Sequence, residues 1–229
     1  MKTLIYVPII HTSADLGSLA KDVTKRGIAD LGEEFWEEHK KTIDGFWSAV
    51  SNYFDSENVV GVKIYQDGMV GEGEVAEKIV EEGVESGSKN YELVSNLIRR
   101  GAILVKTEDF NLVKGELDRL REITQAKNIK EKIIGFVKYK LNKSSLLNKR
   151  DKFIAKRIDE TLRHSEKGIL FIGAYHDIKK KLPRSIHVIE VKSIDRVGEY
   201  HKLLPFYSKH KEQFRELERY LVSKIILTP

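Results

Sequence analysis

Two short apolar runs, each followed by a histidine, constrain the fold of this chain more than any other feature. Leu4 to Ile10 precedes His11, and Gly168 to Tyr175 precedes His176. Both runs are rich in β-branched and aromatic residues and have the length of a buried strand rather than of a core helix. In an open α/β sheet, ligands bind outside the carboxyl ends of the strands. Both histidines therefore stand where a functional site of such a fold is expected.

Five strand-like segments recur along the 229 residues, with helical patterns between them. They cover residues 3–10, 59–65, 101–106, 168–174 and 186–192. Strands separated by helices imply right-handed crossovers and a largely parallel sheet. The sequence therefore predicts a single α/β domain over residues 1–229, with a mostly parallel central sheet flanked by helices.

The helical segments have recognisable ends. Residues 15–54 have one wide apolar face, and two further helices, Glu74–Val84 and Asn90–Arg100, are separated by Gly83 and a Gly-Ser turn signal. Residues 107–165 predict a helical insertion that is broken near residues 142–145. Residues 207–226 predict one terminal amphipathic helix.

Composition limits the chemistry that the chain can support. It contains no cysteine, which excludes disulfides and thiolate catalysis and leaves histidine and carboxylates as the strong side-chain metal ligands. No apolar stretch approaches the roughly 20 residues of a membrane span, and we expect a cytoplasmic protein. A charged fraction of 33%, with only 2 Met, is typical of a thermophile.

Charge is unevenly distributed along the chain. Residues 1–115 hold 13 Lys and Arg against 20 Asp and Glu, whereas residues 116–229 hold 27 against 15. The basic half lacks the interleaved aromatic residues of a surface that stacks on bases. Solvated helix faces therefore explain the charge better than binding of nucleic acid. The sequence is also compatible with assembly into a homo-oligomer.

Polar residues follow each predicted strand. They are His11 with Asp15, then Asp67, then Thr107-Glu108-Asp109, His176-Asp177, and Glu190 with Lys192. If the strands are parallel, these groups gather along one edge of the sheet. Two imidazoles and carboxylates there would either bind a divalent metal or act as general acid and base. We expect His11, Asp67 and His176 to converge at this edge, with the two imidazole groups no more than about 12 Å apart, which allows for ligands at roughly 2 Å from a shared metal and for loop movement.

A structural role remains open for several of these residues. Asp15 and Asp109 are also suited to cap the helices that follow them. The remaining histidines lie in charged helical or edge segments and are expected to be solvated or structural. They are His39, His164, His187, His201 and His210.

Two familiar catalytic loops are absent from the sequence. The segment Gly68–Gly73 follows a predicted strand, but it lacks the Lys-Ser/Thr pair of a P-loop and misses the dinucleotide fingerprint. Acidic neighbours would repel phosphate, and a mobile active-site loop suits this segment better. No Gly-x-Ser-x-Gly elbow is present, which argues against an ordinary α/β-hydrolase.

An Arg-Asp pair, Arg150-Asp151, is followed by a predicted strand and then by a Gly-x-x-His motif at Gly173–His176. This arrangement resembles that of the TraB/Tiki group of the erythromycin esterase/ChaN-like superfamily, in which the Arg-Asp pair starts a helix. Residues 96–105 are similar to the helix, Gly-Ala turn and strand of that group. The group's first Gly-x-x-His corresponds to Pro8–His11, with proline in place of glycine. The nearest candidate for its strand-end glutamate is Asp67, a shorter carboxylate that is displaced by two or three positions.

The resemblance implies a hydrolase of peptides, esters or other small molecules. His11, Asp67 and His176 would hold a divalent metal such as Mn²⁺, Co²⁺ or Zn²⁺, or the two histidines would serve as base and acid. His11, His176 and Arg150 are then the candidate catalytic residues, with Arg150 at an oxyanion or a substrate carboxylate. The alternative is a non-catalytic ligand-binding or signalling protein of the same fold.

The Arg-Asp pair gives two further expectations. Asp151 is placed to cap a helix whose apolar face, Ile154, Ile158 and Leu162, packs on the sheet. A cation at a helix start gains nothing from the helix dipole. Arg150 should therefore have a site carboxylate or a bound anion as its partner, and Arg150→Ala is expected to leave thermal stability nearly unchanged.

Overall fold

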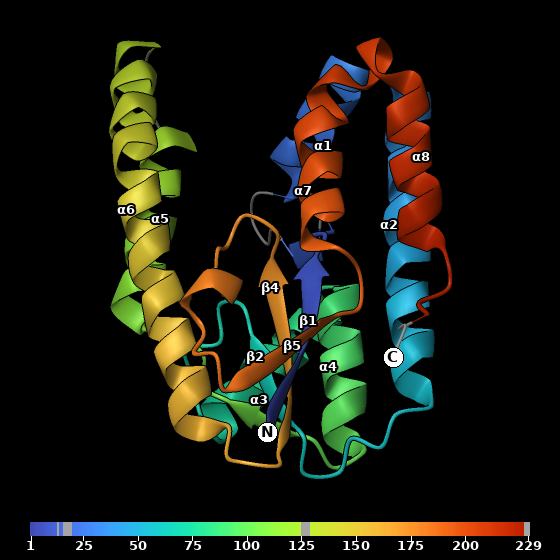
Figure 1. Cartoon of the computed structure of the whole chain (residues 1–229). Coiled ribbons are helices and arrows are strands. Elements are labelled where there is room, and N and C mark those ends of the chain that lie inside the picture. Colours follow the sequence, from blue (N-terminus) through green and yellow to red (C-terminus); the bar gives the residue numbers. More distant parts are fainter. Residues whose placement is uncertain (13, 16–19, 125–128, 227–229) are drawn as a thin grey trace.

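Five parallel strands form the centre of the computed structural model, which describes residues 1–12, 14–15, 20–124 and 129–226 (Figure 1). The strands are β1 Lys2–Ile9, β2 Lys63–Gln66, β3 Ile103–Val105, β4 Lys167–Gly173 and β5 Ile186–Glu190. Their order in the sheet is β3-β2-β4-β1-β5. The α/β class with a parallel sheet flanked by helices is confirmed, and each strand overlaps its predicted segment.

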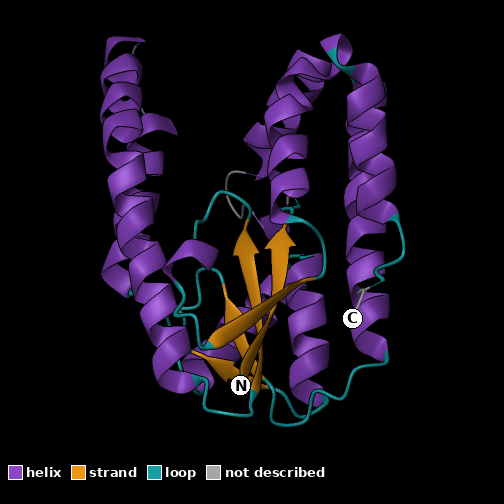
Figure 2. Cartoon of the chain, viewed as in Figure 1, coloured by secondary structure: helices purple, strands orange, loops and turns teal. Residues whose placement is uncertain are grey.

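Helices occupy most of the remaining chain (Figure 2). The longer ones are α1 Ala20–Leu31, α2 Glu33–Asp55, α3 Glu74–Glu85, α4 Lys89–Arg99, α5 Phe110–Thr124, α6 Ile129–Thr161, α7 Ile194–Leu203 and α8 Lys211–Val222. Short 3₁₀ segments include η2 Lys179–Lys181 and η3 Leu204–Lys209.

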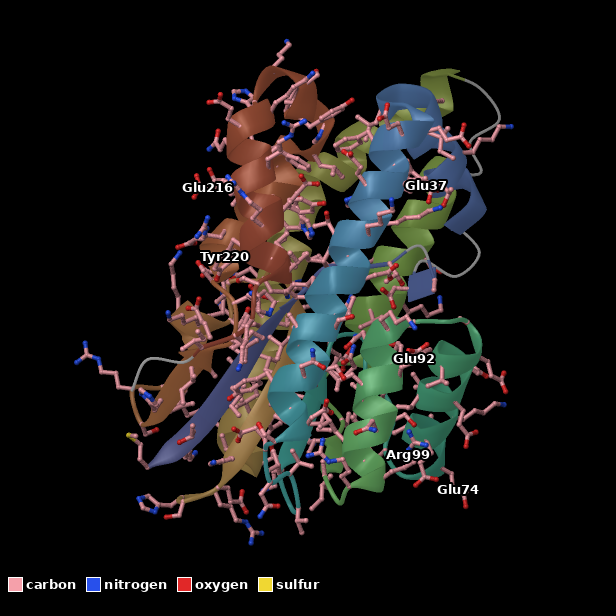
Figure 3. The ribbon with its side chains drawn as sticks, turned by 90° about the vertical axis from the view of Figure 1, so that its right-hand side faces the viewer. Glu37, Glu74, Glu92, Arg99, Glu216 and Tyr220 are labelled. Carbon is pink, nitrogen blue, oxygen red and sulfur yellow. The ribbon has the colours of Figure 1, made fainter. Side chains whose placement is uncertain are left out.

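The helices form unequal layers on the two faces of the sheet. Side chains of α2, α3, α4, α7 and α8 pack with Ile5, Val7, Ile64 and Phe171 in the larger core. On the other face, α6 packs against Leu4, Tyr6, Tyr65 and Leu170 in a smaller core. The alternation of strand residues between the two cores follows from the period of two of a β-strand. Figure 3 labels Glu37 on α2 and Glu92 on α4 on the outer side of the larger layer.

The chain changes direction across the sheet at the neighbouring strands β1 and β4. The connection that leaves β1 crosses toward β2 and β3 through α2, α3 and α4 on the larger-core face. The connections around β4 run back toward β5, with α6 and Ile178 on the opposite face. Right-handed crossovers in opposite directions must use opposite faces. The carboxyl ends of β1 and β4 are therefore a topological switch point, where open α/β sheets bind ligands.

The predicted helical insertion consists of α5 and α6, which lie side by side, and the C-terminal part of α6 packs on the sheet (Figure 1). The break predicted near residues 142–145 was wrong, because α6 continues through it. Asn142, Ser144 and Ser145 each cost a helix only a fraction of a kcal/mol relative to Ala, and no Gly or Pro interrupts this part. As a consequence, Arg150 and Asp151 lie inside a long helix rather than at its start.

Glycines with positive φ mark other boundaries. The region 15–54 divides into two helices at Gly32, whose φ is 90°. α3 and α4 divide at Gly87, whose φ is 80°, and Ser88 then caps α4. Gly83 lies within α3 instead, where a Cβ would come within 2.4 Å of the Tyr91 ring. Its role is thus close helix packing rather than a turn.

The C-terminal segment is shorter than the single predicted helix. It consists of η3 and α8, and Phe214, Leu217 and Leu221 of α8 are buried as the spacing predicted. Lys192 donates hydrogen bonds from Nζ to the carbonyl oxygens of Tyr220 and Ser223, at 2.8 and 2.7 Å. Lys192 therefore satisfies the end of α8 instead of joining the other polar residues at strand ends. No helix in the described part of the chain is long and apolar enough to cross a membrane.

Asp109 caps α5, as one of its two predicted roles required. Its Oδ1 accepts the N–H groups of Asn111 and Leu112 at 2.9 and 3.1 Å. Asp109→Ala is expected to lower the free energy of unfolding by about 1 kcal/mol, because both N–H groups lose their acceptor. Urea denaturation measures this loss. Asp109→Asn keeps the acceptor and serves as the control, and an equal loss in both variants would contradict the capping role.

Candidate functional site

Strand register aligns the residues that follow β1, β2 and β4. Ile9 pairs with Gly173, and Gln66 pairs with Phe171. The backbone N–H of Asp67 continues this ladder by donating to the carbonyl oxygen of Phe171 at 2.9 Å. The Gly173 N–H in turn donates to Oδ2 of Asp67 at 3.1 Å. The Asp67 carboxylate is thereby held over the end of β4.

His11, Asp67 and His176 meet around Gly173. A Cβ placed on Gly173 would lie 3.3 Å from Oδ2 of Asp67, 3.7 Å from Nε2 of His11 and 3.7 Å from Cδ2 of His176. The two imidazole rings are therefore much closer together than the expected limit of about 12 Å. The structure thus brings together the three residues that the sequence singled out, and the missing side chain of Gly173 leaves the space that they face.

The His176 ring is held in place by Asp151. Nδ1 of His176 lies 2.6 Å from Oδ1 of Asp151, and the Asp177 N–H donates to Oδ2 at 3.0 Å. The Lys181 ammonium also reaches this oxygen, at 3.4 Å. Asp151 is almost fully buried and does not cap a helix as predicted, because α6 began twenty or so residues earlier. Its carboxylate fixes the orientation of the imidazole instead.

This pairing changes the pKa of both groups. Burial opposes the charge on His176, but the hydrogen bond to Asp151 and the charge of Asp67 outweigh burial and raise the His176 pKa. Burial also opposes the charge on Asp151, yet its hydrogen bonds with His176 and the Asp177 N–H lower its pKa. Nε2 of His176 lies 3.7 Å from Oδ2 of Asp67. That distance is too long for a hydrogen bond, so Nε2 remains available to another partner.

Arg150 binds three carboxylates. Its Nε donates to Oε2 of Glu108 at 2.7 Å and its Nη2 donates to Oδ1 of Asp67 at 2.7 Å. Nη2 also donates to Oε1 of Glu108, and Nη1 donates to Glu116 of α5. The expected carboxylate partner is thus present. Because these four hydrogen bonds engage most of the five N–H groups of the guanidinium, Arg150 is better suited to hold Asp67 than to meet an oxyanion.

Glu108 is a member of the site that sequence reasoning did not single out. The sequence placed it after a strand, between Thr107 and Asp109. Only the structure shows that its side chain is fully buried and accepts hydrogen bonds from Arg150. The Gly68 N–H also donates to its Oε1, at 3.1 Å. Burial raises the pKa of Glu108 despite the hydrogen bond from Arg150. For Asp67, burial is outweighed by the positive charges of His176 and Arg150, which hold its pKa well below the usual range.

His11 occupies the open side of the site. Its side chain is 47% exposed, and Nδ1 lies 4.0 Å from Oδ2 of Asp15. That same oxygen accepts the N–H and hydroxyl of Thr12, and Ser88 donates its hydroxyl to Oδ1. Asp15 was also expected to cap a helix, but residues 16–19 lie outside the described residues and that expectation stays untested. Asp15 lies on the Nδ1 side of His11, while Nε2 faces Gly173. Ser13, next to this group, lies outside the described residues.

The other histidines have the structural or solvated settings expected of them. His39 is buried, and its Nδ1 lies 2.6 Å from the hydroxyl of Tyr200. His201 is half-buried, with its ring 6.2 Å from that of Tyr200. His187 on β5 is exposed, as are His164 and His210.

Imidazole and carboxylate groups are suitable ligands for a divalent metal, but at this site they are not arranged to share one. In the described ranges of the chain, no three His, Cys, Asp or Glu side chains form a group that could hold a metal ion. Oδ1 of Asp67 is engaged by the Arg150 cation, and Oδ2 accepts the Gly173 N–H. A neighbouring guanidinium repels a second cation. With both oxygens of Asp67 engaged in this way, the arrangement does not fit a metal centre.

No family model, curated protein or solved structure matches this chain. The function therefore has to be inferred from the site itself.

Arg150→Ala is now expected to destabilise the fold strongly, contrary to the expectation from the sequence. The substitution leaves Glu108 and Asp67 without their cation, a change that costs about 3–5 kcal/mol at a buried ion pair. Denaturant unfolding of Arg150→Ala measures this cost, and Glu108→Gln in the same background should restore part of it by removing one unpaired carboxylate. Lys89→Ala, which breaks the exposed pair with Glu92, is the control and should change stability by less than about 1 kcal/mol. Equal, small effects of Arg150→Ala and Lys89→Ala would contradict the buried network.

Proposed function

We propose that this chain is a hydrolase that cleaves an ester or peptide bond with His11 and His176 as a base–acid pair. The observation behind the proposal is the convergence of two imidazoles in different environments on one fixed carboxylate at the switch point of the sheet. Its agreement with the TraB/Tiki-like motifs supports the same reaction class. Pairs of titratable groups whose environments differ are typical of acid and base roles.

The two imidazoles divide the proton transfers. The exposed His11 would accept a proton from water while the water oxygen attacks the substrate carbonyl carbon. When the bond to the leaving group breaks, the protonated His176 would donate its Nε2 proton to the departing oxygen or nitrogen. The raised pKa of His176 favours the protonated ring that this step requires.

The remaining residues position this pair. Asp151 binds Nδ1 of His176 and so directs Nε2 toward the reacting groups. The aspartate of a Ser-His-Asp triad orients its histidine in the same way. Asp67 faces both imidazoles and is suited to orient the water between them. Arg150 and Glu108 hold Asp67, so both are positioning residues and Arg150 is no longer proposed as an oxyanion donor.

Hydrolysis of small aryl esters and of short peptides tests the proposal. His11→Ala and His176→Ala are each expected to lower kcat/KM by at least about 100-fold, since general acid–base groups contribute this much, while His187→Ala should leave it unchanged. Equal rates in all three variants would overturn the base–acid assignment. Titration with Mn²⁺, Co²⁺ and Zn²⁺ is part of the same experiment. Activity that depends on an ion bound through His11, Asp67 and His176 would replace the metal-free mechanism with a metal-dependent one.

The pH dependence gives an independent test of the His176 environment. A group whose pKa is raised by folding stabilises the native state below its unfolded pKa, here about 6.5, and this stabilisation is lost as pH rises through the folded pKa. The wild type should therefore lose stability relative to His176→Gln over that interval. Asp151→Asn should lower the His176 pKa in an NMR titration and shift the alkaline limb of kcat/KM to lower pH. His187→Gln should change neither profile, and an unaltered His176 titration in Asp151→Asn would contradict the pairing.

A non-catalytic ligand-binding or signalling protein is the alternative function. It would bind small molecules or peptides at the same residues without turning them over. Saturable binding that His176→Ala abolishes, with no hydrolysis of any ester or peptide tested, would favour it.

A further inference from the structure

One exposed aromatic residue stands directly beside the candidate site. Tyr175 lies between Ala174 and His176 and is 54% exposed. Its ring centroid is 5.8 Å from that of His201 on α7, with 39° between the ring planes. Most large aromatic side chains bury much of their surface when a protein folds. The exposed part of Tyr175, next to a strand-end histidine, is placed to contact a ligand.

The residues behind this pair are rigidly packed. A Cβ on Gly198 of α7 would lie 4.0 Å from the carbonyl oxygen of Ala174, so the helix contacts the loop that carries Tyr175. Tyr200 is fully buried and stacks on Phe214, with ring centroids 4.8 Å apart. His201 is thus anchored through its own helix to the larger core. The Tyr175–His201 pair, which we call the aromatic wall, can therefore bind an apolar group without reordering the protein.

The wall also differs in charge from the rest of the site. Burial, with smaller contributions from His11 and His39, lowers the pKa of His201 to about 4. His201 is therefore an uncharged ring at neutral pH. His11 contributes electrostatically to the pKa of both His201 and Asp67, so His201 lies near the candidate site. The Tyr175–His201 pair is therefore an uncharged aromatic surface, whereas Asp67 and Arg150 form a buried ion pair.

We propose that Tyr175 and His201 form a subsite for an apolar or aromatic side chain adjacent to the bond that is cleaved. This assignment rests on the proposed hydrolase function and names its substrate class, which is esters or peptides with a large apolar residue at that position. A carboxylate side chain would gain nothing from these uncharged ring faces. The ring faces and their packed support favour the apolar group.

Kinetics with matched esters test this subsite. The p-nitrophenyl esters of N-acetylphenylalanine and N-acetylalanine differ only in the side chain that would meet the wall. Tyr175→Ala is expected to lower kcat/KM by about tenfold for the phenylalanine ester, the scale of a lost apolar contact, and by less than about twofold for the alanine ester. Tyr175→Phe should retain the preference. Phe206→Ala, which removes an exposed aromatic side chain from η3, is the control. Equal losses for both esters would overturn the subsite.

A binding measurement separates this subsite from the reaction itself. N-acetylphenylalanine amide should shift the His201 imidazole resonances of the wild type in a saturable manner, and Tyr175→Ala should abolish the shift. N-acetylalanine amide should shift them less at the same concentrations. Binding with this preference but without ester hydrolysis would uphold the subsite and overturn the hydrolase. Absence of binding, or tighter binding of N-acetyllysine amide, would overturn the subsite even if esters are hydrolysed.

Discussion

The ionic network around Arg150 joins parts of the chain that are distant in sequence. The guanidinium comes from α6, and its carboxylate partners come from the end of β2, from the segment after β3 and from α5. Glu108 is completely buried there. A buried carboxylate is tolerated only when a cation and hydrogen bonds compensate for its lost hydration. The position of Asp67, and with it the geometry that both imidazoles face, depends on this compensation.

A different carboxylate lies beside Nδ1 of each imidazole, and the two pairs differ in distance. Asp151 is buried on α6 and hydrogen-bonded to His176. Asp15 is bound by Thr12 and Ser88 and lies farther from His11. The closer pairing fixes the orientation of one ring and raises its pKa, while the other ring remains exposed. Two residues of the same type thereby acquire different properties, which is the condition for dividing acid and base roles.

Periodicity was sufficient to predict the sheet and the edge where His11, Asp67 and His176 meet. Parallel strands end on the same side, so the residue after each strand was predictable without knowledge of any contact. The sequence did not reveal that Arg150 and Asp151 lie within α6. That outcome depends on helix continuation across residues 142–145, where weak local preferences are outweighed by the neighbouring helical residues. Glu108 was also missed, because a glutamate after a strand is usually solvated and only tertiary packing buries it.

The apolar face of α6 explains how the site acquires its polar residues. Ile154, Ile158 and Leu162 are buried against the sheet, and Arg150 continues the same spacing of four residues toward the carboxyl ends of the strands. Since a helix rises about 1.5 Å per residue, Arg150 stands roughly 6 Å beyond Ile154 along the helix axis. Packing of the isoleucines on the sheet therefore sets the position of the guanidinium beyond the sheet edge. The core and the candidate site are consequently two parts of one helix face, and a change in how α6 docks would move Arg150 and Asp151 together.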